Sequence, residues 1–450
     1  MSDTQFQAGQ YQLVSVFLRN YTRVSKLEIS NLIVGFQTSE SMSSPFIYGK
    51  TTVFDGLDIL STFPIIGEEY IEFTYKDFFG QTRTEEYMVY SVSDIKYPQE
   101  DNPTLIQYTL NFVSIPRVLT EATRIMKGLS KGKVSDYATQ IFNDTYKATM
   151  QSRGLKCKEL YVPQHSDEIQ TLIVPNYTPT ETFLFFARHA FNASSKTQTF
   201  RFFENRDKYF FATNEEVEKF YGNDQSYYDS SKAFQLASGL TLPNAHVFVY
   251  NYLPNIGPDN AKAAMFHIIS IDFGEKVNTI NDINYGAYKK KIAHIDLLNG
   301  TVFAVPTYSI KQDFDKKNQK LAHSDQFINE VMPDKYIRYL IKDYAGAGEP
   351  TGPGIKPDMH YADLYDRKNS YMYHYKQNSV DVTIYGQNKI VAGSVINLQL
   401  PLRKKASAAS ASAIDIERSG YYLADSIDNI FSNKTYTQKI TLSRYGTGTK

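Results

Sequence analysis

The chain has 450 residues, enough for two to four domains, and its 48 basic and 48 acidic residues give a formal net charge of zero. The lack of a basic surplus disfavours a nucleic-acid-binding protein, and the single cysteine, Cys157, excludes an intramolecular disulfide. Residues 1–10 lack the apolar core of a signal peptide, and no apolar run is long enough to cross a membrane. We therefore expect a protein made in a cytoplasm and not inserted in a membrane.

The first quarter of the chain predicts β-strands. Alternation is clearest in residues 69–75, where Ile71, Phe73 and Tyr75 share one face. Residues 77–80 form a turn, and strands at 86–92 and 106–112 follow. The 35 Tyr and 29 Phe, with no Trp, suit half-buried β surfaces and subunit contacts. We predict a first β-barrel domain at residues 1–116.

After Pro116, the spacing of the apolar residues changes from that of a strand to that of a helix. Residues 118–126 have helical apolar spacing, and Ser135-Asp136 is a candidate N-cap for a second helix. Thr178 to Glu181 resembles a helix start, and the apolar segment 183–187 that follows should be buried. Residues 200–203 and 209–211 read as a hairpin around a charged turn. We predict a peripheral mixed α+β domain at 117–230.

The remainder returns to strands with one interruption. Strands are predicted at 266–273 and 292–305, and residues 380–444 are again β. Helical patterns occur at 327–344, 345–357 reads as an exposed Gly- and Pro-rich loop, and 404–413 as a Ser/Ala-rich hairpin extension. The predicted domains are a discontinuous second β-barrel at 231–311 and 376–446 and an inserted helical and loop region at 312–375. The fold class is thus α+β, dominated by β.

One β pattern occurs twice. Residues 87–95 and 422–430 carry identical or similar residues at six matched positions, with 87 aligned to 422. Each block follows a Gly-led alternating strand, beginning at Gly67 or Gly393, and precedes a strand that opens on Tyr-Thr, at Tyr108 or Tyr436. Two β-modules in one chain predict a six-unit ring built from three chains.

No catalytic or metal pattern is evident. Glu68 and Glu69 are adjacent, so on a strand they point to opposite faces and cannot form one acid pair. Gly49-Lys50-Thr51 lacks the first glycine and the following helix of a phosphate-binding loop. His189 is expected to be a core residue, Cys157 to be structural, and Lys289 to Lys291 to be a solvated strand edge. No catalytic, cofactor or metal residue is predicted.

Three segments together resemble the baseplate hub protein of contractile-tailed bacteriophages, which is related to the N-terminal part of type VI secretion spike proteins. They are residues 44–69, ending in Pro64-Ile65-Ile66-Gly67-Glu68-Glu69, the aromatic helix at 182–190, and the closing block at 393–440. The resemblance implies a homotrimer whose six similar barrels form a tube-like ring. The loops at 312–375 and 404–413 depart from the family pattern.

The same resemblance implies the function. We expect a non-enzymatic virion protein of the tail baseplate that joins the hexameric tail tube to the trimeric central spike and lets genomic DNA pass. Its partners would be further copies of itself, the spike, tube proteins and baseplate wedge proteins, without a cofactor. The interface and tube-strand candidates are Ile71, Phe73, Tyr75, Tyr87, Tyr108, Ile396, Leu398, Tyr422, Tyr436 and Ile440.

Three alternatives remain at this point. One is a hub of a contractile secretion system or of a non-contractile tail. Another is a cell-wall-degrading tail enzyme, disfavoured by the missing Trp platforms and acid pair. The third is a receptor-binding fibre, disfavoured because no fibrous repeat is present.

Overall fold

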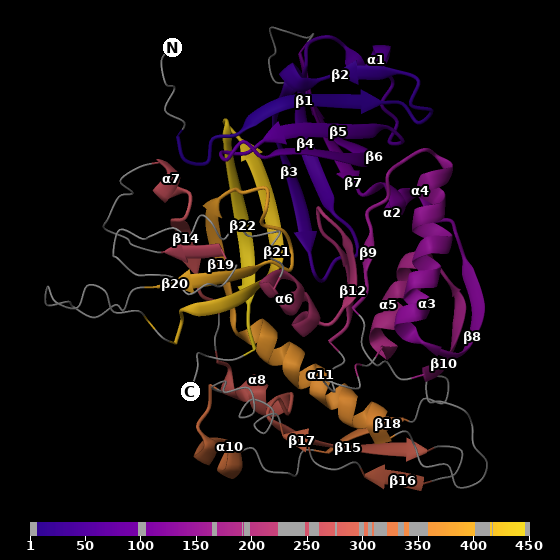
Figure 1. Ribbon diagram of the computed structural model, residues 1–450, viewed down its shortest axis with the longest axis vertical. Helices are drawn as coiled ribbons and strands as arrows, with labels where there is room; N and C mark the ends of the chain where they lie inside the picture. The colour runs from indigo at the N-terminus through magenta and orange to yellow at the C-terminus, as the bar shows by residue number, and fades with distance from the viewer. Residues whose placement is uncertain are drawn as a thin grey trace, which may run out of the picture.

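In the computed structural model, the described residues are 7–97, 105–163, 169–190, 192, 199–223, 248–251, 261–274, 277–296, 301–304, 308–309, 322–331, 337–341, 359–400, 415 and 417–445. The predicted loop at 345–357 and the extension at 404–413 lie outside them. The fold is α+β and dominated by β, as expected, and it is built around a 13-stranded sheet (Figure 1). No described helix combines the length and the apolar character that a membrane crossing requires.

The N-terminal part of this sheet, here called the first unit, contains β1 to β7. Its elements are β1 (Gln12–Arg19), β2 (Lys26–Glu28), β3 (Ile33–Ser41), β4 (Tyr48–Asp55), α1 (Ile59–Thr62), β5 (Tyr70–Lys76), β6 (Thr82–Lys96) and β7 (Ile106–Val113). The pairing order is β3-β4-β7-β6-β5-β1-β2. Alternating apolar residues of these strands form a core in which Phe73 and Tyr75 are fully buried.

The C-terminal part, the second unit, adds β13 (Phe248–Asn251), α7 (Ala261–Ala264), β14 (Ile268–Asp272), β19 (Ser379–Tyr385), β20 (Val395–Gln399), β21 (Gly420–Ser432) and β22 (Thr435–Ser443). Its strands follow the order β14-β19-β22-β21, with β20 beside β21 and β13 beside β20. Its own core includes Val382, Ile396 and Leu442. In Figure 1 the yellow strands β21 and β22 lie beside the indigo strands β3 and β4.

The middle segment, which lies between the two units in the chain, contains both helices and strands (Figure 1). It contains α2 (Ile115–Leu119), β8 (Ile125–Lys133), α3 (Val134–Phe142), a single π turn (Asn143–Lys147), α4 (Ala148–Ser152), β9 (Leu160–Tyr161), β10 (Ile169–Tyr177), α5 (Pro179–His189), β11 (Arg201–Glu204), β12 (Tyr209–Ala212) and α6 (Asn214–Asn223). The α5 start is confirmed, because Thr178 and Glu181 form a reciprocal capping box. The hairpin around residues 204–208 is confirmed as β11 and β12.

Two helix predictions in the middle segment need correction. The helix predicted over 118–126 ends at Leu119, and β8 begins at Ile125 because this segment pairs with β10. The Ser135-Asp136 cap is also misplaced. The helix α3 begins at Val134, and its N-cap residue Lys133 makes no side-chain capping bond.

The segment from α8 to α11 forms a separate layer. It contains α8 (Thr279–Asn284), β15 (Lys289–Asp296), β16 (Thr301–Ala304), β17 (Tyr308–Ser309), α10 (Asp325–Val331), β18 (Ile337–Ile341) and the long helix α11 (Met359–Gln377). Residues 289–309 are predicted within the second barrel, but their strands β15 to β17 form a separate four-stranded sheet with β18. Residues 337–341, predicted as helix, are a strand because they pair in parallel with β15.

The two units repeat one topology. Strands β3, β4, β5, β6 and β7 correspond in chain order and in pairing to β14, β19, β20, β21 and β22. The first strand also has a counterpart, since β1 pairs with β5 and β13 with β20, although β1 is antiparallel and β13 parallel to its neighbour. A duplicated β-module, inferred from residues 87–95 and 422–430, is therefore present at the level of strand order.

The registers refine the alignment of the two copies. In both, β-bulges fall at matched positions, between Val89 and Ser91 in β6 and between Ala424 and Ser426 in β21. The sequence alignment holds from 87 to 93 but is wrong beyond Ser93. There a second irregularity, at Asp94 with φ of 54°, inserts one residue. The Tyr-Thr match is also wrong by two residues, because the register makes Tyr108 the counterpart of Gln438.

Candidate functional site: the buried junction between the two units

The two units join through backbone pairing of β3 with β21. Seven residue pairs, from Gly35 with Ser432 to Ser41 with Ser426, run antiparallel along the contact. Phe36 stacks on Phe431 at 4.1 Å between ring centroids, and Phe431 stacks on Tyr436 at the same distance. The junction is thus a continuous hydrogen-bonded sheet with an aromatic stack on one face.

Gly35 allows this close approach. A Cβ atom built on Gly35 would lie 2.4 Å from the carbonyl oxygen of Phe431, a distance that real Cβ contacts do not show. The obstacle is backbone of the opposite strand, so a rotamer change cannot relieve it. Glycine is therefore required here by packing and not by an unusual φ.

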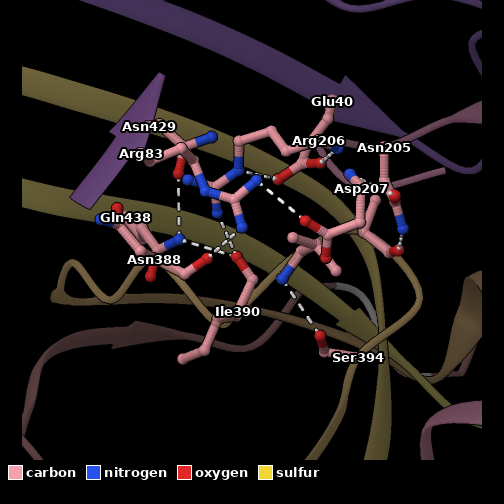
Figure 2. A network of polar contacts seen from close by, with 12 residues as sticks. Glu40, Arg83, Asn205, Arg206, Asp207, Asn388, Ile390, Ser394, Asn429 and Gln438 are labelled. Carbon is pink, nitrogen blue, oxygen red and sulfur yellow. Dashed lines mark hydrogen bonds and ion pairs between the residues drawn. The ribbon is translucent and has the colours of Figure 1, made fainter. Parts of the chain in front are cut away.

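A buried arginine from the middle segment connects both units. Arg206 sits in the turn between β11 and β12, and its Nε is 3.0 Å from Oε1 of Glu40 on β3, with both side chains fully buried. Its guanidinium also donates to Tyr436 Oη at 3.1 Å and to the carbonyl oxygen of Ile390. Figure 2 shows the Arg206 side chain between Glu40 of the first unit and Ile390 of the second.

Because Glu40 and Arg206 are both buried charges, each is stable in the fold only while the other is present. Burial raises the pKa of Glu40, and the adjacent Arg206 guanidinium opposes that rise. Burial alone would lower the pKa of Arg206, but Tyr436 and Glu40 outweigh it and the net shift is upward. A buried charge without its partner carries a large desolvation cost, so removing either member should destabilise the fold strongly.

A second ionic contact lies beside the first. Arg83 on β6 is 2.9 Å from Asp207 and donates to the carbonyl oxygen of Asn388 at 2.8 Å. Asn388 in turn donates its backbone N–H to Asp77 in the β5–β6 turn, at 3.0 Å. The hairpin turn therefore has polar contacts to the first unit and to the loop before β20 of the second (Figure 2).

The predicted interface and tube-strand candidates all lie on strands and are buried inside this chain. Tyr75 and Tyr436 meet at the junction, with ring centroids 6.4 Å apart. The others belong to the unit cores: Ile71, Phe73, Tyr87 and Tyr108 in the first, and Ile396, Leu398, Tyr422 and Ile440 in the second. Side chains buried in one chain offer little surface to another molecule, and a role of these residues at an interface stays a prediction.

Nothing in the sequence indicates that the residues at the centre of the junction are buried. Glu40 and Arg206 are charged, 166 positions apart, and Arg206 lies in a turn rich in charge that reads as solvent-exposed. The middle segment is predicted at the periphery, yet Asn205 and Arg206 of its hairpin turn are buried between the units. A charged residue is placed in a core only by its tertiary partners.

The residues weighed for chemistry have structural roles. Gly49 to Thr51 lie within β4, not in a phosphate-binding loop. The Glu69 carboxylate accepts hydrogen bonds from the backbone N–H groups of Ile66, Gly67 and Glu68, so it caps the turn before β5. Burial raises the pKa of the Cys157 thiol to about 11, which makes it a poor nucleophile at neutral pH. Within the described ranges, no cluster of three or more His, Cys, Asp or Glu residues is arranged to hold a metal ion.

One acid–histidine pair was not expected. Asp282 Oδ2 lies 2.9 Å from His323 Nε2, while its other oxygen accepts from Tyr373 at 2.6 Å. The His323 ring packs between Tyr288 and Phe327, with centroids at 5.3 and 5.0 Å. This aromatic packing identifies the pair as part of the layer below the sheet, anchoring α8 to α11.

Neighbouring His374 on α11 should make stability depend on pH. Burial lowers its pKa to about 4, so the unfolded chain binds a proton between about pH 6.5 and 4 that the folded chain does not. Stability from this group is complete above pH 6.5 and falls with pH, by about 2 kcal/mol at pH 5. Urea unfolding at pH 7.5 and 5 should show this loss in the wild type, and a smaller loss in His374→Gln. Equal losses in both proteins would contradict the assignment.

No protein-family model matches this sequence, and no curated protein is similar enough in sequence to match. Solved structures do match the fold. The tail protein from Neisseria meningitidis aligns over 98% of both chains, with a TM-score of 0.51 and 8% identity. The 43 kDa tail protein of prophage MuSo2 from Shewanella oneidensis aligns over 96% of this chain and 98% of its own, with a TM-score of 0.49 and 10% identity.

A VgrG complex from Francisella aligns over 98% of this chain and 53% of its own, with a TM-score of 0.46 and 9% identity. The fold of this chain is thus similar to that of the Neisseria tail protein, which agrees with the suspected resemblance to phage tail proteins. At such low identity the Neisseria match establishes a common fold.

Proposed function

We propose that this chain is a non-enzymatic structural protein of a phage tail, the central hub of the baseplate. Three copies form a ring of six similar β units that joins the hexameric tail tube to the trimeric central spike. The lumen passes genomic DNA once the spike has left. The domain division at 1–116, 117–230, 231–311 with 376–446, and 312–375 remains a prediction within this proposal, except that β15 to β17 form a sheet of their own with β18.

The observation that carries the proposal is the pseudo-repeat in the sheet. Both units have the same strand order, and β21 joins β3 inside the chain in a head-to-tail contact. A head-to-tail contact uses two different surfaces, so repeating it builds either a closed ring or an open filament. With two units in a chain, three chains give six units, which suits a six-fold tube on one side and a three-fold spike on the other.

The junction supports the same proposal. A ring closes only if each unit is rotated from its neighbour by a fixed angle. The buried Arg206–Glu40 pair and the aromatic stack hold one unit against the other inside the chain. The outer surface of the ring would then contact wedge proteins, and its two rims the tube and the spike.

Mass photometry of the purified protein tests the proposal. We expect particles of three chains, alone or after mixing with spike or tube subunits from the same genome, and a ring with six inner lobes in averaged electron micrographs. A protein that stays monomeric in all of these mixtures would overturn it. A ring that binds tube and spike subunits encoded in a secretion-system locus would assign the chain to that apparatus, and lysis of cell walls would indicate a tail enzyme.

A further inference from the structure

The second half of β6 is an exposed strand edge whose counterpart in the second unit is covered. In β21, residues 420–423 pair with β20 and residues 426–432 pair with β3. In β6, the pairing with β5 ends at Met88, and no described strand pairs with residues 91–96 on that side. Ile427 is 1% exposed, whereas its counterpart Val92 is half-buried and Ile95 is 55% exposed. The first unit thus has an open position where the second unit receives β3.

The strand that matches β3 also has an open edge. By register β14 corresponds to β3, and both carry a β-bulge at the matched place, between Ile33 and Gly35 and between Ile268 and Ser270. Within the described sheet, β14 is the terminal strand and pairs only with β19. Ile269, at the bulge, is 44% exposed. Open apolar edges promote strand pairing between chains.

We propose that residues 91–96 of β6 pair antiparallel with β14 of a second copy of this chain, repeating between chains the β21–β3 contact made within each chain. This inference rests on the proposed ring and names the surfaces that close it. Backbone hydrogen bonds provide the affinity, as in other cases of strand addition. The occupant is a second copy because the chain itself contains the matching pair of surfaces.

The internal contact also fixes the register of the proposed seam. Ile430 faces Gln37 in the β21–β3 pairing. After the extra residue at Asp94, Lys96 corresponds to Ile430, because Lys96 pairs with Gln107 and Ile430 with its counterpart Thr437. Asp272 corresponds to Gln37, because each lies two residues after the residue at which pairing resumes beyond the bulge, Ser270 in β14 and Gly35 in β3. The seam therefore places Lys96 directly opposite Asp272 of the next copy.

The charges at this position are complementary. Lys96 and Asp272 are both exposed, and neither has an ion-pair partner among the described residues. Opposite charges on facing residues of an antiparallel pair stabilise it, and like charges destabilise it. The register of the proposed β6–β14 seam, which was derived from backbone pairing alone, thus places the cation Lys96 opposite the anion Asp272.

Disulfide crosslinking tests the seam and its register. In a Cys157→Ser background, Lys96→Cys combined with Asp272→Cys should give covalent dimers and trimers under mild oxidation, because facing Cα atoms lie within disulfide reach. The matched control combines Lys96→Cys with Ser270→Cys, two residues out of register, and should give no covalent trimer. Mass photometry of the reduced proteins reports assembly separately from crosslinking.

Charge reversal gives a second, independent readout. Lys96→Glu should weaken assembly by about fivefold per seam, and Lys96→Glu with Asp272→Lys should restore it. Trimers that do not crosslink at 96 and 272, or that crosslink only in the control, would overturn the seam and leave the hub proposal standing. A wild type that stays monomeric with its tail partners would overturn both.

Discussion

Arg206→Met should reduce the free energy of unfolding by about 3–5 kcal/mol, the largest single-residue effect expected in this chain. The substitution removes the guanidinium that is 3.0 Å from Glu40 and leaves that carboxylate fully buried without its cation. It also removes the donors to Tyr436 and to the carbonyl oxygen of Ile390. Because typical domains have only about 5–15 kcal/mol of stability, the variant should unfold at much lower urea concentration.

Two variants sharpen the Arg206 test. Lys208→Met changes a cation in the same turn whose partner Glu159 is 83% exposed, so its unfolding midpoint should match the wild type. Glu40→Gln combined with Arg206→Met leaves no unpaired charge, and its amide oxygen can still accept from the backbone N–H of residue 206. This double variant should recover much of the loss. If Arg206→Met were as stable as Lys208→Met, the buried pair would not hold the junction.

Gly35→Ala should separate the two units and prevent ring assembly. The added methyl would lie 2.4 Å from the carbonyl oxygen of Phe431, so β3 and β21 must move apart along their seven-residue pairing. Forcing a group into a packed site costs about 1–3 kcal/mol, and here the cost falls on the contact that fixes the rotation between units. We therefore expect a destabilised chain whose trimer population falls more steeply than its folded fraction.

The control for this prediction is Gly56→Ala, since a Cβ atom at Gly56 has no neighbouring atom within 4 Å. Hydrogen exchange measured by mass spectrometry should show faster exchange in β3 and β21 of Gly35→Ala, with β19 and β22 less affected. Mass photometry then compares the assembly of the two variants. Normal exchange and normal trimers in Gly35→Ala would show that the junction tolerates a wider separation than the structure indicates.

Local patterns in the sequence were enough for several elements. The alternation of Ile71, Phe73 and Tyr75 predicted β5, and the segment Thr178 to Glu181 predicted the start of α5. The repeated blocks at 87–95 and 422–430 indicated two related β-modules, because a duplicated strand keeps its period and its turn positions. These features are encoded in contiguous residues, so no distant contact is needed to recognise them.

Where the observed element differs from the predicted one, contacts with residues far away in the sequence decided which structure formed. Residues 337–341 read as helix but form a strand, because they pair in parallel with β15, more than 40 positions earlier. The alignment of the two copies also failed after Ser93, where a bulge at Asp94 shifts the register by one residue. A bulge depends on which strand lies alongside, so the sequence of one strand cannot place it.

From the sequence came the class of fold, the duplication and the expectation of a ring, because period and repetition are properties of neighbouring residues. Only the tertiary structure revealed that β3 and β21 join the two copies, that Arg206 is buried between them, and that β6 and β14 have edges that no described strand covers. Each of these depends on residues more than 100 positions apart or on an edge left unpaired. Burial and pairing are decided by which surfaces meet when the chain has folded.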